Sequence, residues 1–224
     1  MTQRVLCISV HPDDETLGCG GTLLKEGQEG SEIFWLIVTQ AREPQWSKEI
    51  IRSKEREILK VAEAYKVKRF FQLDFPAAKL DTIPQSHLIQ RIRDLISEVR
   101  PELIYSVHGG DVHSDHRVVF SAMLSAVKPF YMNQLAVRRI VCYETLSSTE
   151  AAAPFIGRSF VPNVFSDIAP YIERKIEIMK LYQTESQLDP LPRGPSAIRA
   201  LARYRGTTVG VEYAEAFMLI RELA

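Results

Sequence analysis

Cysteine and long apolar runs are both scarce in this sequence. Its three cysteines stand far apart, at positions 7, 19 and 142, and an odd, dispersed set argues against a disulfide framework or a thiolate metal cluster. No segment approaches the about 20 consecutive apolar residues of a membrane-spanning helix. The first apolar run is too short for a secretory signal. We therefore expect a cytoplasmic, reduced protein with no membrane span.

An excess of charge of either sign is also lacking. Lysine plus arginine and aspartate plus glutamate both number 28, so the formal net charge is zero. Proteins that bind nucleic acid usually present a strongly basic surface, and we expect no nucleic-acid partner here. Local groups of arginine remain available for an anionic small molecule, because a guanidinium suits phosphate and carboxylate.

Short apolar runs alternate with segments of helical periodicity in the first part of the chain. The runs predict strands at 5–10, 32–39, 69–73, 103–107 and 139–143. The periodic segments predict helices at 15–29, 46–65, 84–99 and 115–128. Such alternation indicates a mostly parallel sheet with helices on both faces and right-handed crossovers. We predict an α/β fold, a Rossmann-like three-layer sandwich.

The pattern is looser beyond residue 145. An extended piece is predicted at 163–165, helices at 169–182 and 197–204, and at 216–223 either a strand or a helix. No change of composition marks a second domain, and the length suits one domain with a sizeable core. We predict a single domain over 1–224, with a Rossmann-like core at 1–145 and a C-terminal part at 146–224 that completes the cleft.

Two clusters of imidazoles and carboxylates follow predicted strands. His11–Glu15 reads His-Pro-Asp-Asp-Glu after the first strand, and His113–His116 reads His-Ser-Asp-His after the fourth. In the strand order 3-2-1-4-5, the first and fourth strands are neighbours at the topological switch point, where ligands bind at the carboxyl ends of strands. We therefore expect the two clusters to face each other.

The clusters together offer ligands for one divalent metal. His11 and Asp14 are three residues apart, as are His113 and His116, and one helical turn places each pair on one side. One histidine and one aspartate from the first cluster and one histidine from the second form a two-histidine, one-carboxylate set. Zinc suits that set, and so does non-haem Fe(II).

The residues left over supply acid–base groups. Asp13 is free to act as a general base on water. The remaining histidine of the second cluster, oriented by Asp115, is placed to stabilise an oxyanion and to protonate a leaving amine. This division of roles describes amide hydrolysis. Taken singly, the acidic residues also fit a favourable helix N-terminus or an N-cap, and Gly18–Gly21 fits close helix–sheet packing better than a dinucleotide fingerprint.

Both clusters resemble the motifs of the LmbE-like, or PIG-L, N-acetylglucosaminyl deacetylases. The similarity continues through Arg52-x-x-Glu55 and the Arg205–Phe217 ending, so it spans essentially the whole chain. The family has a Rossmann-like α/β fold. Its members remove an acetyl group from the 2-amino position of a glucosamine-type sugar, free or attached to a lipid, inositol, malate or natural product.

The resemblance also implies roles for individual residues. His11, Asp14 and His116 would hold the metal, and Asp13 would be the general base. His113 would be the electrostatic catalyst and proton donor. Asp115 would be the partner of His113, and Arg52 would contact the substrate.

Further residues are predicted to line the cleft and bind substrate. Arg42 follows the second strand at the same sheet edge as the clusters, and Arg205 lies in an arginine-rich C-terminal region. Tyr213 and Glu215 are expected to shape the cleft. For the arginines the alternative is a solvated surface charge, and for Tyr213 it is a packing role.

The chain departs from the family pattern after the third strand. Many members carry Pro-Asp-Gly there, with an aspartate that binds a sugar hydroxyl, whereas this sequence has Pro76-Ala77-Ala78. The segment Tyr182–Gln187 is also longer than the usual Tyr-x-Ser-Gln. Both differences bear on the substrate and leave the hydrolytic centre complete.

The sequence thus predicts a zinc-dependent N-deacetylase that acts on an N-acetylated sugar or glycoconjugate of N-acetylglucosamine type. Fe(II) is the alternative metal. Two alternative functions stay open: hydrolysis of a non-sugar amide or phosphoester, and non-catalytic binding of a metal or sugar nucleotide. Family members often form oligomers, and the sequence alone leaves a homo-oligomer open.

Overall fold

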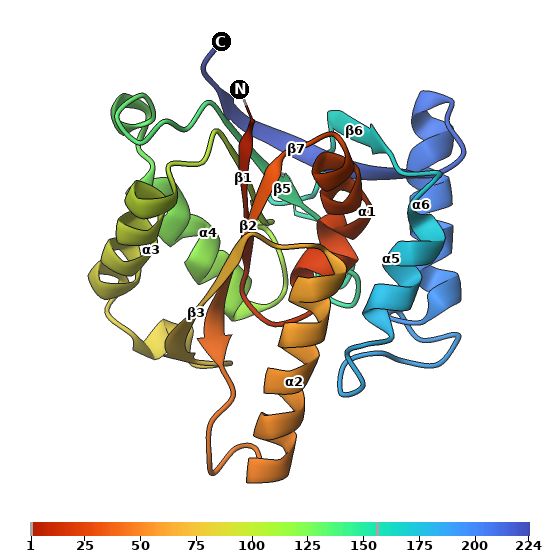
Figure 1. Cartoon of the computed structure of the whole chain (residues 1–224), viewed down its shortest axis with the longest axis horizontal. Helices are drawn as coiled ribbons and strands as arrows, with labels where there is room; N and C mark the ends of the chain where they lie inside the picture. The colour runs from red at the N-terminus through yellow and green to blue at the C-terminus, as the bar shows by residue number, and fades with distance from the viewer. Residues whose placement is uncertain (1, 156) are drawn as a thin grey trace.

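The computed structural model describes residues 2–155 and 157–224, and this part of the chain forms one seven-stranded sheet (Figure 1). The strand order is β3-β2-β1-β4-β5-β7-β6, with β7 antiparallel to both of its neighbours and the other pairs parallel. The strands are β1 Arg4–Ser9, β2 Glu32–Gln40, β3 Arg69–Pro76, β4 Leu103–Val107, β5 Arg139–Tyr143, β6 Val164–Asp167 and β7 Ala214–Glu222. The predicted mostly parallel sheet and its 3-2-1-4-5 core order are confirmed.

Helices cover both faces of the sheet, so the predicted three-layer arrangement is also confirmed. Figure 1 shows α3 and α4 on one side and α1, α2, α5 and α6 on the other. The helices are α1 Asp14–Gln28, α2 Lys48–Ala64, α3 Gln85–Val99, α4 Ser114–Ala126, α5 Ile172–Met179 and α6 Pro195–Val209, with short 3₁₀ turns at Leu80–Thr82 and Pro129–Tyr131. None of the helices in the described residues combines the length and apolarity that crossing a membrane requires.

The burial of the central strands explains why their sequences are apolar runs that predict strands. In β1 every residue after Arg4 is buried, and β4 is buried throughout. Parallel strands covered on both faces are expected to be continuous apolar runs. Val5 pairs with Leu103 and Ile8 with Ser106, so the carboxyl ends of β1 and β4 lie side by side. Residues that follow these two strands are therefore brought to one edge of the sheet.

Helix α1 lies unusually close to the sheet because it carries small residues. A Cβ atom on Gly18 would stand 2.0 Å from the Tyr143 ring, and one on Gly21 would stand 2.9 Å from Ile168. The backbone leaves helical geometry at Cys19, with φ −140°. These contacts support the packing role expected for the Gly18–Gly21 segment.

The C-terminal part joins the same sheet and differs from the prediction in detail. The segment predicted as either strand or helix is β7, which inserts between β5 and β6. The helix predicted at 197–204 is longer in the structure and spans Pro195–Val209. Within it, Gly206 allows the chain after the helix to approach closely, since a Cβ there would stand 2.7 Å from the Val211 carbonyl oxygen. The helix predicted at 169–182 begins only at Ile172, since Asp167 Oδ1 accepts the Ala169 N–H in a competing turn.

Candidate active site

The two clusters meet at a cavity of about 330 Å³, as the strand order predicts. His11, Asp13 and Asp14 line it from the segment after β1, and His113 and His116 line it from the start of α4. The cavity therefore opens at the carboxyl edge of the sheet, beside the switch point between β1 and β4.

Hydrogen bonds within the first cluster fold the chain sharply after β1. Asp14 Oδ2 accepts the backbone N–H groups of Val10 and His11 at 2.9 and 2.8 Å. Asp13 has a left-handed backbone with φ 118°, which turns the chain into α1. Glu15 is buried and accepts the Asp13 N–H at 3.3 Å. The turn thus points Asp13 and Asp14 at the cavity and uses Glu15 for structure.

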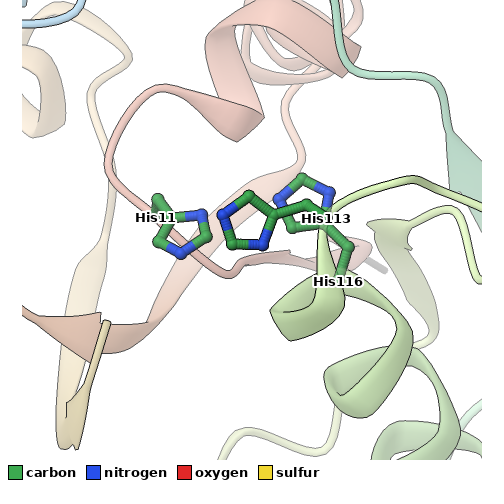
Figure 2. A group of neighbouring side chains, drawn as sticks. All are labelled: His11, His113 and His116. Atoms are coloured by element: carbon green, nitrogen blue, oxygen red, sulfur yellow. The ribbon is translucent and has the colours of Figure 1, made fainter. Parts of the chain in front are cut away.

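Three imidazole rings converge at the cavity. Figure 2 shows His11 from the segment after β1 beside His113 and His116 from the start of α4. The ring centroids of His11 and His113 are 4.5 Å apart, those of His113 and His116 are 4.9 Å apart, and one nitrogen from each of the three rings lies within 4.8 Å of the others. The hydrogen-bond partners of each ring decide which nitrogen is free to bind a metal.

His116 is held with Nε2 facing the first cluster. Its Nδ1 lies 3.1 Å from Asp111 Oδ2, and its Nε2 lies 3.3 Å from Asp14 Oδ1. Burial alone would lower the pKa of His116, but the two carboxylates outweigh it and raise that pKa to about 10. Surroundings that stabilise a proton between His116 and Asp14 also stabilise a divalent cation there.

His11 is oriented in the same manner. Its Nε2 lies 3.1 Å from Asp115 Oδ2, which leaves Nδ1 turned toward Asp14 Oδ2 at 3.8 Å. Although burial favours the neutral acid, the nearby His116 and His11 hold the pKa of Asp14 well below its usual range. A carboxylate that backs the outer nitrogen of a ligand histidine is typical of metal sites.

His113 differs from the other two histidines. Its Nδ1 accepts the backbone N–H of Asp115 at 3.2 Å. A neutral imidazole has one acceptor and one donor nitrogen, so Nε2 carries the hydrogen and is a donor. Burial, reinforced by the charges of His11 and His116, lowers the pKa of His113 and favours this neutral form.

The donor set fits one divalent metal. Neutral imidazole and carboxylate groups suit zinc, and the two-histidine, one-carboxylate combination also suits Fe(II). The free nitrogens of His11 and His116 and the carboxylate of Asp14 supply such a set, whereas the Nε2 hydrogen of His113 points to hydrogen-bond donation instead.

The structure changes the partner expected for Asp115. Its carboxylate accepts the Ala78 and Leu80 N–H groups at 2.7 and 3.1 Å in addition to contacting His11. Only the backbone of Asp115 reaches His113. The first turn of α4 directs the Asp115 side chain toward the segment after β3, where it accepts these two N–H groups. Asp115 therefore orients His11.

Asp13 is nearly buried in the cavity wall. Burial and the neighbouring Asp14 carboxylate raise the pKa of Asp13 well above its usual range, against the opposing charge of Arg193. Arg193 Nη1 lies 3.2 Å from Asp13 Oδ2. A carboxyl group whose pKa is shifted upward is suited to take and return a proton near neutral pH.

Two predicted arginines lie near the cavity without lining it. Arg42 lines an adjoining cavity of about 300 Å³ and donates to the carbonyl oxygen of Asp74. Arg52 is exposed on α2 and falls outside the lining residues, whereas its neighbours Lys54 and Glu55 line the main cavity.

The three predicted C-terminal residues lie elsewhere. Arg205 forms a two-pronged ion pair with Glu144 at 2.7 Å per bond. The ring of Tyr213 lies beneath the guanidinium of Arg203, 5.6 Å from it. Glu215 is buried behind α1. None of the three is among the residues that line the main cavity: Arg205 lies on α6, Tyr213 lies just before β7, and Glu215 lies in β7.

Sequence reasoning did not single out Asp111 or Glu185, and it gave Arg193 no individual role. Asp111 is buried and also accepts from Ser148 at 2.8 Å, so it ties His116 to the loop after β5. Asp111 lies between the end of β4 and the second cluster, and this place in the sequence could have identified it as a site residue. For Glu185 and Arg193 no local motif existed, because their partners lie far away in the sequence.

The buried Lys175–Glu215 ion pair predicts a large stability effect. Lys175 Nζ lies 2.7 Å from Glu215 Oε1, and Glu215 also accepts the N–H groups of Gly21 and Thr22 at 2.8 and 2.7 Å. Lys175→Met is expected to lower the free energy of unfolding by about 3–5 kcal/mol, because the buried carboxylate loses its cation. Urea denaturation measures this, with the exposed Lys180→Met as control. A loss below about 1 kcal/mol, typical of exposed pairs, would contradict the prediction.

The sequence comparison decides the family. Residues 6–127, more than half of the chain and including both clusters, match the family described as PIG-L: GlcNAc-PI de-N-acetylase. The chain belongs to this family. The resemblance of its two motifs to PIG-L proteins is thereby confirmed.

Other PIG-L-like proteins match over most of their length. Diacetylchitobiose deacetylase of Thermococcus kodakarensis is 25% identical over 97% of this chain and 83% of that protein. A probable N-acetyl-alpha-D-glucosaminyl L-malate deacetylase 2 of Bacillus cereus is 25% identical over 84% of this chain and 87% of that protein. The structure of N,N'-diacetylchitobiose deacetylase from Pyrococcus horikoshii superposes with a TM-score of 0.77, at 21% identity, over 97% of this chain and 84% of that one. This likeness shows the shared fold.

Proposed function

We propose that the protein is a metal-dependent hydrolase that removes an acetyl group from an N-acetylated sugar or sugar conjugate of N-acetylglucosamine type. The observation that carries the proposal is that the side chains of His11, Asp14 and His116 converge with those of Asp13 and His113 in one cavity. The deacetylases similar to this chain support the reaction and the class of substrate.

His11, Asp14 and His116 would hold the metal, with zinc favoured and Fe(II) as the alternative. When bound, a divalent metal supplies a Lewis acid and lowers the pKa of water toward about 7. Asp111 and Asp115 would fix the tautomers of His116 and His11 from behind, through the 3.1 Å contacts to their outer nitrogens.

The remaining groups of the chain divide the proton transfers. Asp13 accepts a proton from the water that attacks the acetyl carbonyl carbon. The Nε2–H of His113 donates a hydrogen bond to the carbonyl oxygen as negative charge develops there. When the C–N bond breaks, Asp13 returns the proton to the amine, and the products are acetate and the amino sugar. His113 donates a hydrogen bond but does not supply the proton for the amine. Its Nδ1 accepts the Asp115 N–H, so the ring is neutral and carries its single hydrogen on Nε2.

The rest of the cavity suits a sugar. Ligand sites combine apolar walls with a few placed polar groups. Here the apolar wall includes the half-buried Trp46 and the buried Ile58 of the α2 region, and the polar groups facing it include Gln72 and Ser147. Ala77 also lines the cavity, so the position where many relatives have a hydroxyl-binding aspartate is apolar in this protein.

We also propose a cytoplasmic location. Cys7, Cys19 and Cys142 are all free and buried, which suits a reducing compartment.

Acetate release tests the proposed function. The protein, loaded with Zn(II) or Fe(II), is incubated with a panel of N-acetyl sugars, sugar nucleotides and glycoconjugates, alongside a non-sugar N-acetyl amide and a phosphoester. We expect acetate from at least one sugar member and a large loss of that signal in the Asp13→Asn variant. Cleavage confined to the non-sugar amide or the phosphoester, or no turnover with metal bound, would overturn the proposal.

A further inference from the structure

A row of alternating charges lines one wall of the cavity beside Asp13. Arg193 Nη1 lies 3.2 Å from Asp13 Oδ2 and 2.8 Å from Glu185 Oε2. Lys54 Nζ bonds to the other oxygen of Glu185. All four side chains line the cavity. Each carboxylate is therefore followed by a cation, in the order Asp13, Arg193, Glu185, Lys54.

The buried Asp13 carboxylate is stabilised by the guanidinium of Arg193 beside it. It is nearly buried and directly precedes two further acidic residues, Asp14 and Glu15. Among the ion pairs of the described residues, Arg193 is the partner of the Asp13 carboxylate. Buried like charges repel strongly unless a cation stands nearby. Without Arg193 the Asp13 side chain would be free to rotate away from its acidic neighbours.

The contact also selects one oxygen of Asp13. In the described part of the chain, the Asp13 carboxylate accepts one hydrogen bond, from Arg193 Nη1 to Oδ2. Oδ1 is thus left for the reacting water. Proton transfer requires the accepting atom within hydrogen-bond reach of the donor, so an arginine that fixes Oδ2 also fixes where Oδ1 points.

Arg193 is itself held in place from behind. Its backbone N–H donates to Gln187 Oε1 at 3.0 Å, and Glu185 holds its guanidinium. These two contacts hold the Arg193 guanidinium beside Asp13.

We propose that Arg193 is a positioning residue, which holds the general base Asp13 through Oδ2 and is supported by Glu185 and Lys54. This inference rests on the proposed function and extends it to the segment between α5 and α6. That segment, which contains Glu185 and Arg193, includes the stretch of the sequence that departs from the family pattern.

The test compares three variants of the metal-loaded enzyme on the N-acetyl sugar that it deacetylates fastest. Arg193→Gln is expected to lower kcat about 100-fold, the scale of a misplaced catalytic group, with KM nearly unchanged. Arg193→Lys is expected to recover part of that loss, since an ammonium restores the charge without the planar fork. Glu185→Gln retains an acceptor for Arg193 and is expected to have a smaller effect.

The matched control is Arg199→Gln. Arg199 forms a 2.8 Å ion pair with Glu173 outside the cavity, so its loss should leave kcat in place. Metal content and melting temperature are measured for every variant. Added guanidinium ion, well below unfolding concentrations, should raise kcat of Arg193→Ala, which a purely structural role would not predict.

Three results would overturn the inference: kcat of Arg193→Gln within twofold of the unaltered enzyme, a rise in KM at constant kcat, or loss of metal or fold in both Arg193→Gln and Arg193→Lys. The first result would mean that Asp13 keeps its position without Arg193. The second would mean that Arg193 binds substrate, and the third would mean that the role of Arg193 is structural. If the unaltered enzyme releases no acetate from any sugar, the proposed function fails, and this inference fails with it.

Discussion

Replacement of Asp13 with asparagine is expected to lower kcat for acetate release by about 10²- to 10⁴-fold, the range of a positioned general base. The amide keeps the size of the side chain but accepts no proton at neutral pH. Metal content should be unchanged, because the ligand groups lie on His11, Asp14 and His116. Steady-state kinetics together with metal analysis of the same sample measure both quantities.

Asparagine is a better substitution than alanine at position 13 because the backbone there has a positive φ. Asp13 has φ 118°, and asparagine and aspartate enter positive-φ conformations more readily than alanine does. An alanine variant would therefore mix strain with the loss of the carboxylate. Asp94→Asn, on the exposed face of α3, is the matched control. Turnover by Asp13→Asn near that of Asp94→Asn would remove Asp13 as the base.

Replacement of His116 with alanine is expected to abolish metal binding and, with it, turnover. His116 is 2% exposed, and its Nε2 lies 3.3 Å from Asp14 Oδ1, so its truncation removes one of the three proposed ligand groups from the buried side of the site. Metal content after dialysis against a metal buffer measures the effect. The exposed His87→Ala on α3 serves as control.

A second variant separates metal binding from folding. Asp111→Asn keeps the shape of the side chain that contacts His116 Nδ1 at 3.1 Å and should weaken metal affinity by about 10- to 100-fold, as loss of an outer carboxylate partner does. Full metal occupancy in a folded His116→Ala protein would contradict the ligand assignment. Unaltered affinity in Asp111→Asn would mean that the Asp111–His116 contact does not tune the site.

The first turn of α4, which carries Asp115, shows which features of the site the sequence could predict and which it could not. Motif spacing placed both clusters at neighbouring strand ends, and the structure brings them to one cavity. Spacing could not assign the partner of each histidine. That assignment depends on the first turn of α4, which turns Asp115 toward His11 and the backbone of Ala78. The orientation of a side chain at a helix start is decided by what packs opposite it.

The predicted hydrolytic groups His11, Asp13, Asp14, His113 and His116 line the main cavity, whereas the predicted C-terminal substrate contacts lie outside its lining. Arg205, Tyr213 and Glu215 were chosen from the C-terminal pattern, yet their neighbours there are Glu144, Arg203 and Lys175. A charged or aromatic side chain can pair with several kinds of partner, and the packing of the folded chain decides which partner it meets. Arg193 joins Asp13 across 180 residues of sequence, which no local pattern shows.

The sequence by itself determined the sheet order of the core, the edge where the clusters lie, and the donor types at that edge. It did so because strands buried on both faces must be continuously apolar and because parallel strands bring their carboxyl ends to one side. Only the tertiary structure decided the strand state of β7, the polar partners of the three histidines, and the charge row from Asp13 to Lys54. These depend on contacts between distant segments, whose energies exist only once the chain has folded.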